Sequence, residues 1–274
     1  MTEVSPHRPH SLTLVMSSAR SGSTLLCHDI ASLGGLGFPR EYMKGFGSAA
    51  DWGSVSEADV LNRVARGGRK GAPGVAALKL MVPQAVPTYR AITGQQLRQG
   101  DAMSRMVDWA RERFDRVLLV FLVRNALDQA ISSAIAKQTG VFHSTDPRFA
   151  GGTTAVGLED DGLNRRILHH LSLIVRNQQI LTAVHAEHAD LGLMLTYEGL
   201  TRDVDATTRA LVATARAQGF DVRREVVTRK LTKIISDDRA AAIRDSFLDF
   251  LRSEPGIWPS GHAAEFPWSS LAGR

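Results

Sequence analysis

A short segment of small and hydroxylated side chains near the N-terminus has the clearest chemical meaning in the sequence. Residues 17–24 read Ser-Ser-Ala-Arg-Ser-Gly-Ser-Thr and lie between an apolar run and a stretch with helical periodicity. The spacing resembles the nucleotide phosphate loop Gly-x4-Gly-Lys-Ser/Thr, with Gly22 and Thr24 in the expected places and serine replacing the first glycine and the lysine. Such a loop directs backbone N–H groups and a helix N-terminus at an anion, and Arg20 supplies a cation. The alternative is a serine-rich helix cap without a ligand.

A second candidate for anion binding is the arginine that follows the most apolar run of the sequence. Residues 117–123 are all apolar, and Arg124 comes next. In an ATPase the comparable strand ends in an aspartate that holds Mg²⁺, whereas the planar guanidinium of an arginine matches a phosphate. Ser132 follows eight residues later, about two turns into a helix that begins near Asn125, and it can bind the same phosphate. The alternative is a surface arginine and an ordinary helical serine.

The elements that must position these side chains follow from alternating apolar and helical patterns. Buried strands are predicted at residues 12–16, 75–81, 117–123 and 193–197, and helices at 23–33, 57–65, 83–92, 102–114, 126–139, 163–181, 204–218 and 237–252. This alternation is typical of an α/β fold with a P-loop-like, doubly wound and mostly parallel sheet flanked by helices. We expect a single domain over residues 1–274, with 1–10 and 254–274 peripheral to it.

The net charge and the aromatic content of the sequence indicate which kinds of partner the protein can bind. The formal net charge of +5 and the isoelectric point of about 9.7 suit an anionic small molecule as well as they suit nucleic acid. No run of five basic residues occurs and only 6% of residues are aromatic, so we expect no nucleic-acid partner.

The expected compartment follows from the cysteine count and the apolar runs. Cys27 is the only cysteine, so no intramolecular disulfide can form. The N-terminus has no signal-peptide pattern and no apolar run approaches about 18 residues, so we expect a cytoplasmic protein with no membrane partner. A homodimer is compatible with the sequence.

These motifs together resemble the sulfotransferases that use 3'-phosphoadenosine 5'-phosphosulfate (PAPS), and most closely the bacterial trehalose-sulfotransferase type. Residues 17–26 are similar to the 5'-phosphosulfate loop of that family, and Arg124 with Ser132 is similar to its Arg-x7-Ser element for the 3'-phosphate. Further short similarities lie at residues 39–42 (Pro-Arg-Glu-Tyr), 79–81 (Lys-Leu-Met), 129–132 (Gln-Ala-Ile-Ser), 138–139 (Gln-Thr) and 197–200 (Tyr-Glu-Gly-Leu). They cover roughly residues 12–200.

The resemblance implies transfer of a sulfuryl group from PAPS to a hydroxyl of a small acceptor, either a carbohydrate or a secondary metabolite, with 3'-phosphoadenosine 5'-phosphate (PAP) as product. No metal is expected. Donor contacts are implied for Ser18, Ala19, Arg20, Ser21, Gly22, Ser23, Thr24, Arg124, Ser132, Arg229 and Lys230. The last two are only half of the family's late Arg-Lys-Gly pattern, since Leu231 replaces the glycine.

Glu41 and Arg20 are the expected catalytic residues, Glu41 as the general base for the acceptor hydroxyl. Four histidines are alternatives for that role: His28, His143, His169 and His170. Lys79 ends an apolar run and could approach the donor or the acceptor, or could be structural.

Two other functions are alternatives for a loop of this kind. A P-loop kinase would need a lysine in place of Ser23 and an acidic residue at the strand end, and the sequence has neither. A non-catalytic protein that binds PAP or another nucleotide is the second alternative, because a binding loop does not require a base. The acceptor is expected near residues 34–53 and 140–162, which show no helical or strand period.

Overall fold

The computed structural model describes residues 9–46, 55–68, 72–142, 161–229 and 236–253. The chain divides into two compact units. The first combines Met1–Val123 with Asn177–Arg229, and the second combines Arg124–Arg176 with Lys230–Arg274. The expectation that the two act as a single domain stays a prediction.

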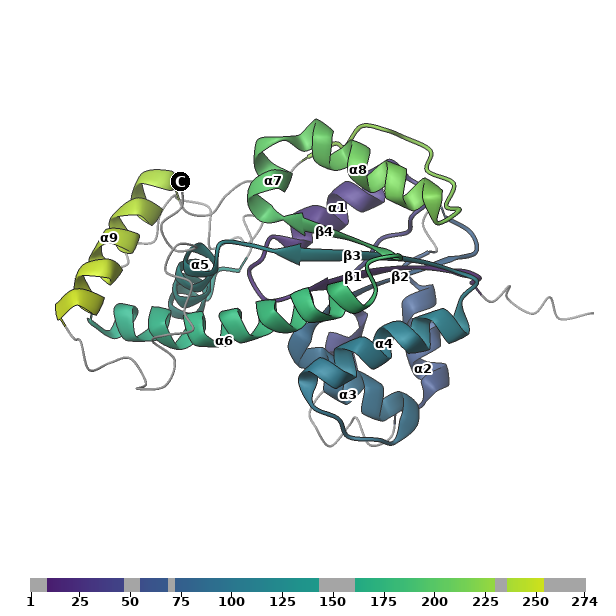
Figure 1. Ribbon diagram of the computed structural model, residues 1–274, viewed down its shortest axis with the longest axis horizontal. Coiled ribbons are helices and arrows are strands. Elements are labelled where there is room, and N and C mark those ends of the chain that lie inside the picture. Colours follow the sequence, from purple (N-terminus) through teal and green to yellow (C-terminus); the bar gives the residue numbers. More distant parts are fainter. Residues whose placement is uncertain (1–8, 47–54, 69–71, 143–160, 230–235, 254–274) are drawn as a thin grey trace, which may run out of the picture. The chain divides into compact units, whose positions relative to one another are not determined.

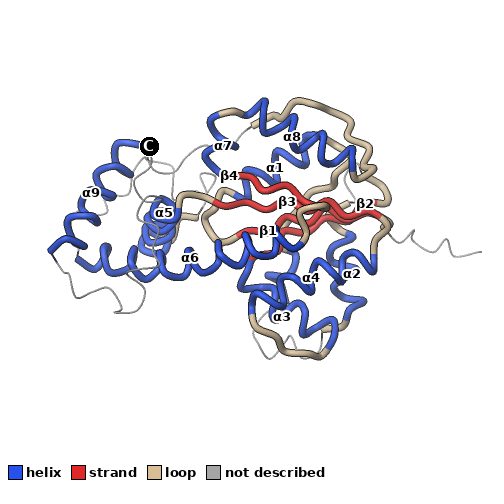
Figure 2. The backbone as a smooth tube through the Cα atoms, in the orientation of Figure 1, coloured by secondary structure: helices blue, strands red, loops and turns tan. Residues whose placement is uncertain are grey.

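The first unit is built on one parallel sheet. Its strands are β1 (Ser11–Ser17), β2 (Val75–Met81), β3 (Arg116–Val123) and β4 (Gly192–Thr196), and they lie in the order β2-β1-β3-β4 (Figures 1 and 2). All three pairings are parallel. Every residue of β1 is buried, as expected for a strand that is covered on both faces.

Helices cover both faces of this sheet, as Figure 1 shows. On one face lie α1 (Ser23–Leu33), α7 (Tyr197–Arg202) and α8 (Val204–Ala217); on the other lie α2 (Glu57–Ala65), α3 (Val82–Thr93) and α4 (Gln99–Arg113). Each face has its own apolar cluster, the first around Val15, Leu26 and Val120 and the second around Leu14, Met106 and Phe121. The predicted doubly wound α/β fold is therefore confirmed. No helix in the described ranges is long and apolar enough to cross a bilayer.

The second unit is helical in its described part. It contains α5 (Ala126–Thr139), the first part of α6 (Asp161–Glu187) and α9 (Asp237–Ser253). Their facing sides form a third apolar cluster that includes Leu127, Ile167 and Phe247. An ion pair between Arg244 and Asp128 joins α9 to α5.

Most predicted elements begin or end within three residues of those observed, but two short ones were missed. Tyr42–Phe46 is a 3-10 helix (η1) in a stretch predicted to be irregular. The predicted strand 193–197 ends one residue early, because Tyr197 begins α7, which Thr196 caps by accepting a hydrogen bond from the backbone N–H of Gly199. Both elements are too short to show a helical period, so the pattern gave no sign of them.

Candidate active site

The predicted phosphate loop is a tight turn between β1 and α1. β1 ends at Ser17 and α1 begins at Ser23. Arg20 has a φ of 63° and Gly22 a φ of 90°, both in the left-handed region. For a residue with a side chain this region costs about 1–2 kcal/mol, so the conformation of Arg20 is one that the surrounding turn imposes.

Among the described residues, no side chain caps the N-terminus of α1. The N-cap residue is Gly22. Ser21 is fully buried, and its Oγ has no hydrogen-bond partner among the described residues. Uncapped N–H groups, the positive end of the helix dipole and an unused buried hydroxyl together fit a bound phosphate or sulfate group.

A tyrosine ring lies directly against this turn. A Cβ atom placed on Gly22 would be only 2.3 Å from Cδ2 of Tyr197, the first residue of α7. Only glycine fits at this position, because a methyl group would overlap the ring. The ring therefore forms one wall of the loop, a contact that sequence reasoning did not foresee.

A buried lysine, Lys79, connects Glu41 to the phosphate loop. The Nζ of Lys79 is 2.9 Å from Oε1 of Glu41 and donates a hydrogen bond of 3.4 Å to Oγ1 of Thr24. The side chain of Lys79 is only 7% exposed, whereas that of Glu41 is 29% exposed. One ammonium therefore contacts both the candidate base and a hydroxyl of the phosphate loop.

The sheet dictates where Lys79 points. Side chains alternate between the faces of a strand, and Lys79 shares its face of β2 with Val75, which packs in the apolar cluster around α1. Its backbone N–H donates to the carbonyl of Arg40 at 2.9 Å, so the chain before Glu41 runs along the edge of β2. That backbone bond places Glu41 within reach of Lys79.

Gln84 orients the carboxylate from the other side. Its Oε1 accepts a hydrogen bond from the N–H of Met81 at the start of α3, at 3.1 Å. This bond turns the Nε2 of Gln84 toward Oε2 of Glu41, at 3.3 Å. Each carboxylate oxygen of Glu41 thus has a donor of its own, and the charged form is the one that both donors stabilise.

The balance of burial and charge keeps Glu41 ionised. Burial raises the pKa of this carboxyl, but the charge and hydrogen bond of Lys79, aided by Lys44 and Gln84, outweigh it, and the pKa is lower than usual for a glutamate. The ion pair therefore stabilises the fold at pH values above the unfolded pKa, and this contribution is lost as the pH falls through the lowered pKa.

The other predicted donor residues are distributed over both units. Arg124 directly follows β3 in the chain and Ser132 is buried in α5, both in the second unit. Arg229 is in the first unit, where its guanidinium pairs with Asp29 at 2.6 Å. Lys230 lies outside the described residues.

The histidines that are alternatives for the general base lie in different parts of the chain. His28 is on the exposed side of α1, where its ring packs edge-on against Phe38 at 5.0 Å, and burial, followed by the charge of Arg40, lowers its pKa. His169 and His170 are on α6 within the second unit. His143 lies outside the described residues.

Replacing Lys79 by methionine should raise the pKa of Glu41, because burial then acts without its main opposing charge. The measurement is a carboxyl ¹³C titration of glutamate in wild-type protein and in Lys79→Met. Lys44→Met is the matched control, since Lys44 is exposed and contributes less to the lowering. An unchanged Glu41 pKa in Lys79→Met would contradict the importance of this ion pair.

No curated protein matches the chain significantly. The family model of the Stf0 sulphotransferases matches residues 13–245, which include most of β1, the phosphate loop, the Glu41–Lys79 pair and most of both units. That match confirms the resemblance found from the motifs, and the chain belongs to the Stf0 sulphotransferase family.

Proposed function

We propose that this protein transfers the sulfuryl group of PAPS to a hydroxyl group of a small acceptor and releases PAP. The observation that carries the proposal is the contact of Lys79 with both Glu41 and Thr24. This contact connects the ionised carboxylate of Glu41 with a loop that is suited to binding phosphate. Binding of a nucleotide alone does not require such a carboxylate, whereas transfer to a hydroxyl benefits from one.

The donor would be held by its two phosphate groups. Residues 18–24, with the uncapped start of α1, suit the 5'-phosphosulfate. For the 3'-phosphate we propose Arg124 and Ser132, since a guanidinium and a hydroxyl at these positions match the family element. PAPS supplies an activated sulfuryl group whose bond to the phosphate oxygen breaks during transfer.

The residues of the site would divide the remaining work. Glu41 accepts the proton of the acceptor hydroxyl as its oxygen bonds to sulfur. Arg20, Thr24 and the N–H groups at the start of α1 stabilise the negative charge that develops on the phosphate oxygen. Once Glu41 is protonated, the Lys79 ammonium loses its counter-ion but keeps its contact with Thr24, so its charge also favours that oxygen.

PAP should bind without a metal and should raise the Tm, whereas AMP should raise it little. The reason is that recognition of the 3'-phosphate rests on Arg124, so Arg124→Ala should weaken PAP binding by about 1.5–3 kcal/mol, the range for a charge-assisted hydrogen bond. A thermal unfolding assay with PAP and with AMP measures the change in Tm. Isothermal titration with and without EDTA measures the PAP affinity of the wild-type protein and of Arg124→Ala. Arg105→Ala is the control, because this arginine is exposed and pairs with Asp108 in its own helix. Equal stabilisation by Mg-ATP and PAP would count against the proposal.

Glu41→Gln should retain the fold and PAP affinity but lose about 10²-fold or more in kcat, the contribution typical of a general base. The amide keeps the size of the side chain and one acceptor oxygen for Lys79, but it cannot take the proton. For wild-type protein, kcat/KM should fall as the pH drops through the Glu41 pKa, at a lower pH than for an ordinary glutamate, and the variant should lack this limb.

Glu225→Gln is the control for this experiment, since Glu225 is exposed and pairs with Arg216 at the surface. A Glu41→Gln protein within a few-fold of wild type, together with an inactive His28→Ala protein, would assign the base to His28 instead.

A further inference from the structure

Asp29 is a charged side chain buried inside the first unit. It lies on α1, and its side chain is only 3% exposed. Burial raises the pKa of Asp29, and the hydrogen bonds and charge of Arg229 partly offset this. A buried carboxylate is tolerated only when it is paired, so the ion pair with Arg229 is what permits Asp29 to be there.

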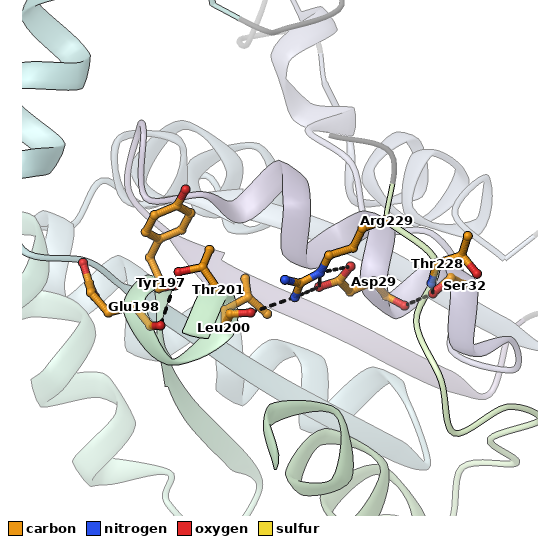
Figure 3. A network of polar contacts seen from close by, with 8 residues as sticks. All are labelled: Asp29, Ser32, Tyr197, Glu198, Leu200, Thr201, Thr228 and Arg229. Atoms are coloured by element: carbon orange, nitrogen blue, oxygen red, sulfur yellow. Dashed lines mark hydrogen bonds and ion pairs between the residues drawn. The ribbon is translucent and has the colours of Figure 1, made fainter. Parts of the chain in front are cut away.

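Arg229 satisfies this carboxylate and a helix end at the same time, as Figure 3 shows. Its Nε donates to both oxygens of Asp29, at 3.3 and 3.2 Å, and its Nη2 donates to Oδ2 at 2.6 Å. The same Nη2 donates to the carbonyl of Leu200 at 2.8 Å. Leu200 is in α7, a helix of six residues whose carbonyls have few intrahelical partners.

The chain before Arg229 is fastened along α1. The N–H of Arg224 donates to the carbonyl of Leu33 at 2.8 Å, and the N–H of Thr228 donates to Oγ of Ser32 at 3.4 Å. The Ser32 hydroxyl in turn donates to the carbonyl of Asp29 at 2.8 Å. Arg229 is therefore held at a fixed place on α1, and from there it reaches α7.

The position of α7 matters because its first residue contacts the phosphate loop. Tyr197 lies so close to Gly22 that no side chain would fit between them. A shift of α7 would therefore move the ring that walls the loop. The contacts form a continuous path from Asp29 through Arg229 and α7 to the loop.

We propose that Asp29 and Arg229 are positioning residues that hold α7, and through Tyr197 the phosphate loop, in the conformation that binds the donor. Arg229 acts through the loop and not as a donor ligand. Withdrawing its guanidinium to bind a phosphate would leave the Asp29 carboxylate buried without its counter-ion, which is strongly unfavourable. This inference rests on the proposed function, because it assigns the donor to that loop.

A double-mutant cycle in PAP affinity distinguishes positioning from direct contact. If the pair acts as one unit, Asp29→Asn and Arg229→Gln should each weaken PAP binding by about tenfold. The double variant should then bind PAP at least as tightly as the single variant that has the lower PAP affinity. If Arg229 were a donor ligand, Arg229→Gln alone would weaken binding, while Asp29→Asn would leave it unchanged or improve it.

The role of Tyr197 is tested in a second background. In Tyr197→Ala protein the effect of Arg229→Gln on PAP affinity should largely vanish, because the path to the loop is already broken. General loss of stability would weaken binding in both backgrounds and would overturn the inference. Glu225→Ala is the matched control, since Glu225 is an exposed residue of the same segment that pairs with Arg216 and takes no part in holding Arg229, and it should leave PAP affinity unchanged.

Two outcomes separate this inference from the proposed function. Wild-type protein that fails to bind PAP would count against the function itself. Wild-type protein that binds PAP, combined with additive effects of Asp29→Asn and Arg229→Gln, would overturn only the positioning role. If Asp29→Asn does not fold, Arg229→Lys replaces it. Lysine keeps the charge, but its single nitrogen cannot reproduce the contact of Nε and Nη2 with the carboxylate together with the bond to the Leu200 carbonyl, so it should weaken PAP binding in wild type and much less in Tyr197→Ala.

Discussion

The ammonium of Lys79 is buried at the carboxyl end of β2, and its charge requires partners that two other parts of the chain provide. Glu41 supplies the counter-ion and Thr24 supplies a hydroxyl from the phosphate loop. Because Lys79 belongs to a strand of the sheet, it fixes both partners relative to a rigid element. The ion pair also keeps Glu41 ionised despite its burial, so the side chain that should accept a proton is already in the state that can accept one.

The loop itself depends on a second buried ion pair, on the same side of the sheet. Lys79 reaches the start of α1, whereas Asp29 and Arg229 lie further along this helix and hold α7 against it. In both places a charge is buried only because a partner from a distant segment meets it. Each pair therefore links the sequence regions that a sulfuryl-transfer site needs, and each is costly to break.

Much of the architecture could be predicted because it depends on local pattern. The apolar runs of β1 and β3 and the helical periods of α1, α2 and α5 are properties of short windows, and these elements appear within one residue of the predicted bounds.

The contacts that make the site could not be predicted, because they join residues far apart in the chain. Arg229 and Asp29 are 200 positions apart, and the residues around each of them do not indicate that the other is its partner. The resemblance suggested Arg229 as a donor contact, but its geometry shows a guanidinium that is engaged with Asp29 and Leu200. A signal existed only for Lys79: a lone charge at the end of an apolar strand must find a buried partner.

Transfer of ³⁵S from labelled PAPS into an extract of hydroxylated metabolites tests the central claim most directly. Wild-type protein should move the label from PAPS to an acceptor and form PAP in equal amount, and Glu41→Gln and Lys79→Met should both do so far more slowly. Label that stays in PAPS, although the wild-type protein binds PAP, would contradict the account and would indicate a nucleotide-binding protein without transferase activity.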